Sequence, residues 1–243
     1  MGLWLEQHAA RIDRANFRAH DQYLEQAPHF PYEPLMAYLR ESGLTPWLDL
    51  VGGEDGAFGC VTREVDGRVV SRDLIDSVLE LSFVGRTVQN VGSVLDIGAG
   101  YGRFAHRFAK MCPWVVVYCT DAIPVSRDVC RAYLNHRGLP PEWVIEPADV
   151  MSLPPIDLAV NVHSWSECTR EEVVAWLEVL TGLDVRRLFI VPHTPTFGLW
   201  SPDRGGGHGD SYVQELAMRG WKMTHTWGGP ACCPKTYSWW ERE

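Results

Sequence analysis

The stretch VLDIGAGYGRF, residues 94–104, reads as a buried strand, a glycine turn and the start of a helix. Its first part is a short apolar run that includes β-branched side chains, which is typical of a strand. After the turn, Phe104, Phe108 and Met111 recur at the helical period. The stretch therefore predicts a strand–turn–helix unit. Asp96 stands at the carboxyl end of its strand, where open α/β sheets bind their ligands.

Three glycines form the turn: Gly98, Gly100 and Gly102. Glycine permits positive φ and lets a ligand approach the backbone closely. A dinucleotide-binding turn has the spacing G-x-G-x-x-G, but Arg103 occupies the sixth position counted from Gly98. A phosphate-binding P-loop ends in a Lys-Ser/Thr pair, and no such pair follows here. The pattern is instead D-x-G-x-G-x-G, with Asp96 two residues ahead of the first glycine.

This pattern resembles motif I of the class I S-adenosylmethionine (SAM) methyltransferases. The resemblance implies a Rossmann-like α/β fold with a seven-stranded, mostly parallel sheet and an antiparallel final hairpin. It also implies SAM as cofactor and S-adenosylhomocysteine (SAH) as product, with Gly98, Gly100 and Tyr101 under the amino-acid end of SAM. Asp96 would then lie near the ammonium group or order the loop. The alternative is that Asp96 only caps the turn of another nucleotide-binding α/β protein.

Further cofactor contacts are expected where later strands end. Asp121 ends the second predicted strand, about 20 residues past Gly98, a spacing typical of an acid that accepts hydrogen bonds from ribose hydroxyls. The resemblance implies that Asp149, with Val150 beside it, binds the adenine amino group. Asn161, in the fourth predicted strand, completes the expected cofactor contacts. A role for Asp121 or Asp149 as a plain turn or cap residue stays open.

The segment NVHSWSE, residues 161–167, lies beside the reacting methyl group if the resemblance holds. It lacks the Asp/Asn-Pro-Pro-aromatic pattern of enzymes that methylate base amines, and it resembles the N-x-x-S-[FW]-x-E pattern of sugar O-methyltransferases. A hydroxyl acceptor needs a base, and His163 carries a group whose ordinary pKa is about 6.5. Glu167 could orient that imidazole or act as the base itself, and His193, after the fifth strand, is a reserve base.

Purely structural roles for His163 and Glu167 stay open. His163 could bond only to a backbone carbonyl, and Glu167 could serve only to favour the N-terminus of the helix that follows. Which of His163, Glu167 and His193 is the base is therefore left undecided.

Residues 1–90 are predicted to form an N-terminal helical cap region. Its front part predicts two helical segments up to Gly43, followed by an irregular stretch over residues 44–70. Ser71 is expected to cap the next helix. Residues 91–243 are predicted to form the SAM-binding core.

In this core, strands and helices alternate, which indicates a parallel sheet. Strands are predicted over residues 93–97, 114–120, 143–146, 157–162, 187–191, 221–226 and 236–241. Residues 193–210, long and glycine-rich, are predicted to be a lid-like loop.

Composition narrows the class of protein. The chain has 243 residues, 46% of them hydrophobic, and a net charge of −9, which disfavours a nucleic-acid partner. It contains no 18-residue apolar run, so we expect no membrane insertion and a cytoplasmic location. Seven cysteines without C-x-x-C spacing predict reduced thiols and no zinc. No metal site is predicted, although carboxylates and histidines near the site leave divalent-metal dependence open.

These patterns together predict a SAM-dependent O-methyltransferase that modifies a hydroxyl of a sugar or oligosaccharide. The methylmannose polysaccharide type is one candidate within that group. Eleven tryptophans suit a carbohydrate ligand, with Trp165 and Trp200 nearest to the predicted site. The alternatives are an O-methyltransferase of a small metabolite or phenol, and a non-catalytic SAM-binding protein. The acceptor and the oligomeric state, including a homodimer, stay open.

Overall fold

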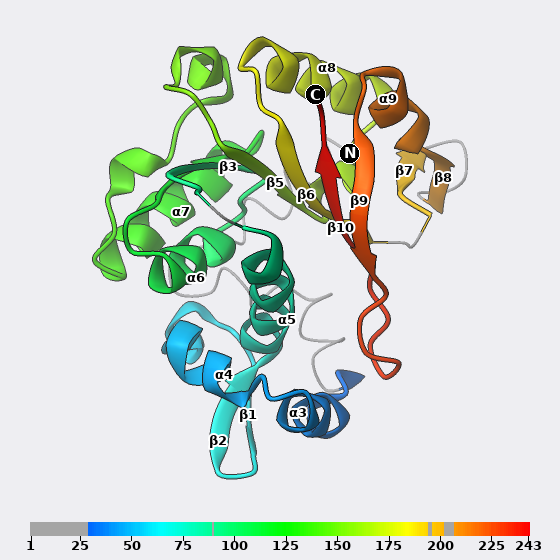
Figure 1. Cartoon of the computed structure of the whole chain (residues 1–243). Coiled ribbons are helices and arrows are strands. Elements are labelled where there is room, and N and C mark those ends of the chain that lie inside the picture. Colours follow the sequence, from blue (N-terminus) through cyan, green and yellow to red (C-terminus); the bar gives the residue numbers. More distant parts are fainter. Residues whose placement is uncertain (1–28, 89, 194–195, 202–206) are drawn as a thin grey trace. The chain divides into compact units, whose positions relative to one another are not determined.

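The computed structural model describes residues 29–88, 90–193, 196–201 and 207–243 (Figure 1). The first predicted helical segment lies outside these residues. The chain divides into two compact units. The helical unit contains the residues up to Thr87, Gly100–Pro113 and Ile123–Val144, and the sheet unit contains Val88–Ala99, Trp114–Ala122 and Ile145–Glu243. The predicted division of the chain at residue 90 remains a prediction.

The sheet unit is built on six strands in the order β4-β3-β5-β6-β10-β9 (Figure 1). The strands are β3 (Ser93–Ile97), β4 (Val116–Thr120), β5 (Leu158–Val162), β6 (Arg187–Val191), β9 (Lys222–Trp227) and β10 (Tyr237–Glu241). The first four are parallel, whereas β10 runs antiparallel to both β6 and β9. The predicted mostly parallel sheet with a closing antiparallel hairpin is confirmed.

The prediction of seven strands is wrong for the described residues. The predicted strand over residues 143–146 is reduced to a single bridge between two short 3₁₀ helices, η3 (Pro141–Trp143) and η4 (Pro147–Ser152). The Ile145 N–H still donates to the Cys119 carbonyl of β4, at 2.9 Å. Prolines at positions 140, 141 and 147 lack the N–H groups that a longer ladder needs, so only this short contact remains.

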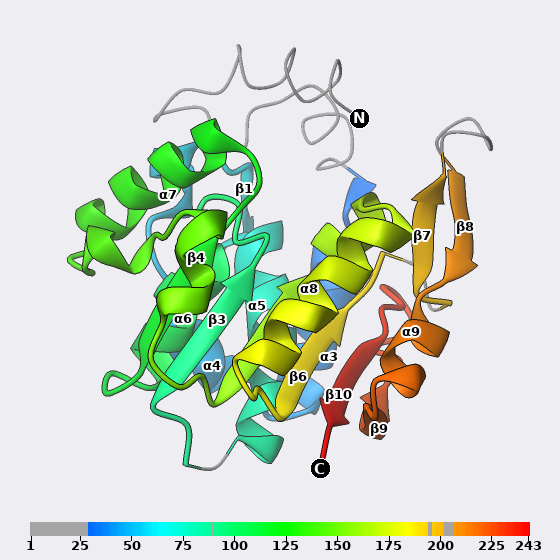
Figure 2. The same ribbon diagram turned by 90° about the horizontal axis from the view of Figure 1, so that it is seen from above.

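One face of the sheet is covered by α8 (Arg170–Gly182) and α9 (Val213–Met218), and Figure 2 shows α8 lying along β6. Val173, Leu177 and Leu180 of α8 pack with alternate side chains of β3, β5 and β6 in one buried cluster. The helix begins with the predicted capping box, in which Thr169 and Glu172 bond to each other's backbone N–H groups.

Residues 193–210, predicted to be a lid-like loop, are not all loop, and their role as a lid stays a prediction. They contain β7 (Gly198–Ser201), which pairs with β8 (Gly207–Ser211) in an antiparallel two-stranded sheet. Phe197 and Leu199 are both buried in the hydrophobic cluster of the sheet unit. This alternation of apolar residues at the base of the hairpin is the sequence signal for a strand that the glycines obscured. Residues 194–195 and 202–206 lie outside the described part of the chain.

The helical unit contains five α-helices among its described residues. They are α3 (Tyr32–Glu41), α4 (Thr45–Val51), α5 (Arg72–Thr87), α6 (Arg103–Met111) and α7 (Pro124–His136), with the 3₁₀ helix η2 (Asp55–Phe58) and the strands β1 (Thr62–Val65) and β2 (Arg68–Ser71). The prediction of an irregular stretch over residues 44–70 is therefore wrong. Asp66 and Gly67, at φ 52° and 70°, form a two-residue turn that joins β1 to β2. An Asp-Gly pair is a strong hairpin signal.

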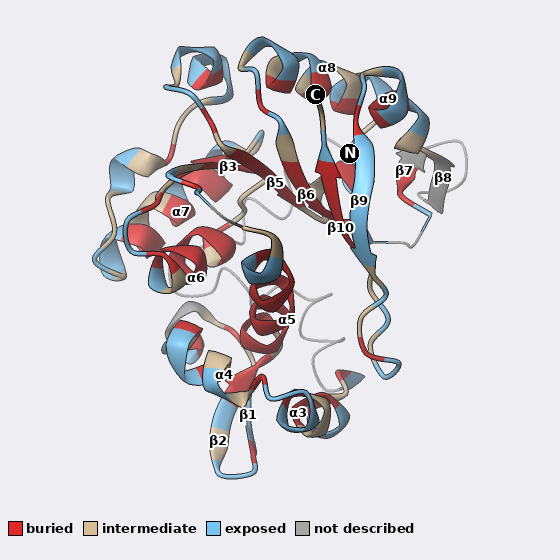
Figure 3. Cartoon of the chain, in the orientation of Figure 1, coloured by how far each residue is buried: buried red, intermediate tan, exposed pale blue. Residues whose placement is uncertain are grey.

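Helix α5 lies at the centre of the helical unit and packs against α3, α4, α6 and β2. The Ser71 Oγ accepts a hydrogen bond from the Leu74 N–H at 2.9 Å, so the predicted N-cap is confirmed. The helix is buried over most of its length, as Figure 3 shows, and the buried residues include Asp73, Ser77 and Glu80. None of the helices in the described part of the chain is both long and apolar enough to cross a membrane.

Candidate functional site

The residues predicted for the site gather at one edge of the sheet. Strands β4, β3, β5 and β6 are parallel, so their carboxyl ends meet at the same edge. The chain passes from β3 to β4 on one side and later to β5 on the other, which makes β3 the point where the strand order reverses. Open α/β sheets bind ligands at such a point. Asp96, Asp121, Asn161, His163 and His193 all lie in or directly after these strand ends.

The turn after β3 is hydrogen-bonded to the end of β4. The N–H groups of Gly98 and Ala99 both donate to the carbonyl of Thr120, at 2.9 and 3.0 Å. Gly98 has a φ of +74°, and a Cβ there would overlap the side chain of Ser164. Position 98 therefore needs glycine for two reasons, its left-handed backbone and its lack of side-chain space.

Asn161 joins this turn to the segment after β5. Its amide nitrogen donates to the Ile97 carbonyl at 2.9 Å and to the Ser164 Oγ at 2.8 Å, and its oxygen accepts from the Trp165 N–H at 3.0 Å. Asn161 is buried. Because both ends of its amide already have protein partners, the geometry supports a role in holding the two segments rather than a direct ligand contact.

His163 has a backbone conformation that is rare for a residue with a side chain. Its φ is +71° and its ψ is −33°, and its N–H donates to the Val191 carbonyl of β6 at 2.7 Å. Non-glycine residues adopt such φ values at an energetic cost, and these residues cluster at functional sites. The imidazole lies against that of His193, with 4.7 Å between ring centroids and an interplanar angle of 45°.

Glu167 extends the pair of histidines into a cluster of three groups. Its Oε1 lies 3.7 Å from the Nε2 of His193. The backbone N–H of His193 donates to the Ser166 Oγ at 3.0 Å. Both side chains keep solvent contact, with 34% of His193 and 54% of Glu167 exposed. Desolvation of the carboxylate by the surrounding protein raises the pKa of Glu167, and the negative charge of Asp121 raises it further. We call His163, Glu167 and His193 the imidazole–carboxylate cluster.

Asp149 and Val150 lie in η4, which belongs to the sheet unit. Asp149 is exposed, whereas Val150 is buried in the hydrophobic cluster. A ligand contact by Val150 would therefore have to come from its backbone. Asp96 is only 2% exposed, which favours its role in ordering the loop over direct ligand contact.

Gly100 and Tyr101 belong to the helical unit. Gly100 has a φ of +56°, and a Cβ built there would meet no atom of the described residues within 4 Å, so as far as these residues go a ligand has room to approach this backbone. The side chain of Tyr101 is buried, and its hydroxyl donates to Asp73 at 2.6 Å. Only the backbone of Tyr101 is placed to meet a ligand.

Trp165 does not serve as a sugar platform, contrary to the prediction. It is fully buried and packs edge-on against Tyr212, with 5.8 Å between ring centroids. The side chain of Trp200 lies outside the described part of the structure. Sequence reasoning missed Ser164 and Ser166 as parts of the site. Their place within the NVHSWSE segment was the available signal.

A metal site is not assembled by the described residues, because no three His, Cys, Asp or Glu side chains among them could hold an ion together. The described cysteines form no disulfide with one another, and most of them are buried.

No family model and no curated protein sequence matches the chain. Its fold does match solved structures. Mitomycin 7-O-methyltransferase MmcR matches over 97% of this chain and 74% of its own, with 16% identity and a TM-score of 0.53. The magnesium protoporphyrin IX methyltransferase ChlM of Synechocystis PCC 6803, solved with bound SAM, matches over 87% of this chain and 98% of its own, with 15% identity and a TM-score of 0.50.

A third similar structure is that of the PH0226 protein of Pyrococcus horikoshii OT3. It matches over 71% of this chain and 92% of its own, with 14% identity and a TM-score of 0.54. The chain therefore has the Rossmann-like α/β fold found in class I SAM-dependent methyltransferases.

Proposed function

We propose that this protein is a SAM-dependent O-methyltransferase whose acceptor is a hydroxyl of a sugar or oligosaccharide. The observation that carries the proposal is the strained His163, which lies at the carboxyl end of β5 with its ring against His193. A buried structural histidine would need neither this backbone strain nor a second imidazole and a carboxylate beside it.

The residues of the turn fit SAM as the cofactor. Gly100 leaves open space next to its backbone, as close approach by a ligand requires. Asp121 would bind the ribose hydroxyls and Asp149 the adenine amino group, while Asp96 and Asn161 would order the loop. ChlM, which has a similar fold, was solved with SAM bound.

The imidazole–carboxylate cluster suits transfer to oxygen. When bound, SAM supplies a methyl group on a positively charged sulfur, ready for direct displacement. A neutral hydroxyl becomes a good nucleophile only as its proton leaves, and the His163 imidazole is the group proposed to take that proton. His193 lies against the His163 ring and Glu167 lies beside His193, so the carboxylate charge of Glu167 would stabilise the imidazolium that forms.

The sugar acceptor rests on the likeness of the NVHSWSE segment to sugar O-methyltransferases, with the methylmannose polysaccharide type as one candidate. A small metabolite or phenol is the second candidate, because mitomycin 7-O-methyltransferase has a similar fold over almost all of this chain. The burial of Trp165 weakens the sugar case, since this indole cannot stack on a ring. A cytoplasmic location is part of the proposal; it rests on the lack of an 18-residue apolar run in the sequence and agrees with the expected reduced thiols.

The test is transfer of a labelled methyl group from SAM to a panel of mono- and oligosaccharides and phenols. The matched variants are His163→Asn, His193→Gln and Glu167→Gln. Asparagine, like histidine, is enriched among non-glycine residues with positive φ, so the first variant removes the base at a small cost in backbone strain.

We expect His163→Asn to lower kcat by about 10²- to 10⁴-fold while SAH affinity is unchanged. Unchanged turnover would remove His163 as the base. Binding of SAH without transfer to any acceptor fraction, cell extracts included, would favour a SAM-binding protein that is not an enzyme.

A further inference from the structure

Helix α5 carries a polar stripe inside the helical unit. Asp73, Ser77 and Glu80 are spaced at i, i+4 and i+7, so they share one face of the helix. All three are buried, Ser77 and Glu80 completely. Most of the remaining buried positions of α5 are apolar. The two carboxyl groups of this stripe need a reason, because burying a charge is costly unless it is paired.

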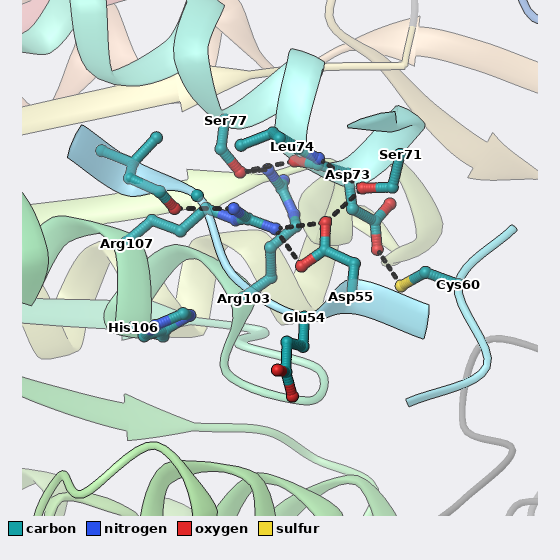
Figure 4. Close-up of polar contacts among 12 residues, drawn as sticks. Glu54, Asp55, Cys60, Ser71, Asp73, Leu74, Ser77, Arg103, His106 and Arg107 are labelled. Atoms are coloured by element: carbon teal, nitrogen blue, oxygen red, sulfur yellow. Dashed lines mark hydrogen bonds and ion pairs between the residues drawn. The ribbon is translucent and has the colours of Figure 1, made fainter. Parts of the chain in front are cut away.

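Tyr101, in the glycine turn, and Arg103, directly after it, are the hydrogen-bond partners of these three residues. The Tyr101 hydroxyl donates to the Asp73 carboxylate at 2.6 Å. The Arg103 guanidinium donates to the Ser77 Oγ at 2.7 Å and to both oxygens of Glu80 at 2.7 and 2.9 Å. Figure 4 shows the Arg103 side chain reaching Ser77, with Asp73 farther along the same helix. We call this set the α5 clamp.

The α5 clamp holds the two residues on either side of Gly102. Gly100 and Gly102 have φ values of +56° and +88°, and glycine loses more backbone freedom on ordering than any other residue. Helix α6 starts directly after Gly102 without a side-chain cap. The bonds of Tyr101 and Arg103 to α5 therefore restrain a backbone segment that would otherwise be loosely defined.

Stability alone does not account for these bonds. Buried ion pairs are often no more stabilising than apolar side chains of the same volume. Their distinctive property is geometric, because a guanidinium bonded to both oxygens of a carboxylate has a defined plane and direction. Burial opposes the charge of Arg103, but Glu80 raises its pKa well above the ordinary value, so the pair stays ionised.

We propose that Tyr101 and Arg103 are positioning residues that set the backbone of Gly100–Gly102 in advance for SAM. The inference rests on the proposed function and deepens it. Tyr101 and Arg103 act through their bonds to α5, and their side chains do not touch the cofactor. Removing these bonds should therefore weaken cofactor binding, which raises KM for SAM, and leave kcat nearly unchanged.

The test uses two variants of the full chain and two measurements. Tyr101→Phe removes one hydroxyl, and Arg103→Leu combined with Glu80→Leu replaces the ion pair by apolar side chains. Hydrogen exchange of the unliganded protein reports the order of residues 97–104, and calorimetric titration with SAH reports affinity. We expect faster exchange confined to this segment and SAH binding that is about tenfold weaker in each variant. The melting temperature of the double variant should be close to that of the wild type.

Arg68→Ala is the control, because it breaks an exposed ion pair with Asp49 in the same unit. It should leave both measurements unchanged. Unchanged exchange at residues 97–104 in Tyr101→Phe and in the double variant overturns the positioning role, whatever SAH does. If exchange rises locally but SAH affinity is unchanged, α5 orders the segment without any effect on cofactor binding. That result would also overturn the positioning role. Failure of the wild type to bind SAH would overturn the proposed function and the inference together.

Discussion

Gly98 has no space for a side chain, so we expect substitution at this position to destabilise the fold. In Gly98→Ala, the new methyl group would collide with Ser164 and the residue would keep a φ of +74°. We expect a loss of about 2–4 kcal/mol in the free energy of unfolding, measured with urea.

Gly100→Ala is the matched control, because position 100 has a positive φ but open space around it. It should lose only about 1 kcal/mol, the price of the backbone conformation. Equal losses in the two variants would show that Ser164 does not restrict position 98. The double variant Gly98→Ala with Ser164→Gly should recover the steric part of the loss.

Because of His106, we expect the stability of the folded protein to fall at acidic pH. Burial lowers the pKa of His106 to about 3, with further lowering by Arg107, Arg137 and Lys110. Its Nδ1 is hydrogen-bonded to the Tyr133 hydroxyl at 2.9 Å. At pH values between about 3 and 6.5, the unfolded chain binds a proton that the folded chain does not, so stability must fall as the pH falls through this range.

The measurement is urea unfolding of the wild type and of His106→Gln at two pH values. Between about pH 7.5 and pH 5.5, the wild type should lose about 1.4 kcal/mol more than the variant. An equal loss in both proteins would mean that His106 is protonated in the folded state.

Residue positions at strand ends could be predicted, whereas residue contacts could not. Asp96, Asp121 and His163 follow apolar runs, so their place at the edge of the sheet follows from the strand pattern. The steric conflict between Ser164 and a Cβ at position 98 depends on how β5 pairs with β3. This pairing joins residues far apart in the sequence, so no local sequence pattern predicts it. The same holds for the Tyr101 hydroxyl, which turns toward Asp73.

At the scale of elements, Arg107 ties α6 to the segment between α4 and β1. It donates to the Val51 carbonyl at 2.8 Å and to both oxygens of Asp55 at 2.7 and 2.8 Å (Figure 4). Both side chains are buried. Removing one member of such a pair leaves a buried charge, so Arg107→Met should lose about 3–5 kcal/mol in unfolding experiments.

The double variant Arg107→Met with Asp55→Leu should recover most of this loss, because no buried charge remains. A double variant that is as unstable as the single one would place the loss in packing and not in charge.

Elements with strong apolar patterns were predicted well, whereas short elements that contain or adjoin glycine or proline were not. Helix α5 and strand β6 follow strong apolar patterns, and β6 ends where the sequence predicts. The hairpins β1–β2 and β7–β8 were taken for loops because glycines interrupt them. In the first hairpin, Gly67 supplies the turn and does not break the strands. The missing third strand reflects prolines whose effect on pairing was underestimated.

At the scale of the whole molecule, the order of the elements predicted the fold class. Alternating strands and helices, followed by a closing hairpin, are sufficient to indicate a mostly parallel sheet with an antiparallel end. The division into two interleaved units could not be predicted, because each unit joins segments far apart in the sequence.

The most direct test of the account is calorimetric titration of the full chain with SAH, with NAD as the control ligand and Asp121→Asn as the matched variant. We predict micromolar SAH binding that is at least tenfold weaker in the variant, because a neutral amide is a poorer acceptor for two ribose hydroxyls. NAD should not bind. Binding of NAD in place of SAH, or of neither ligand, would contradict the assignment of the glycine turn to SAM and with it the proposed reaction.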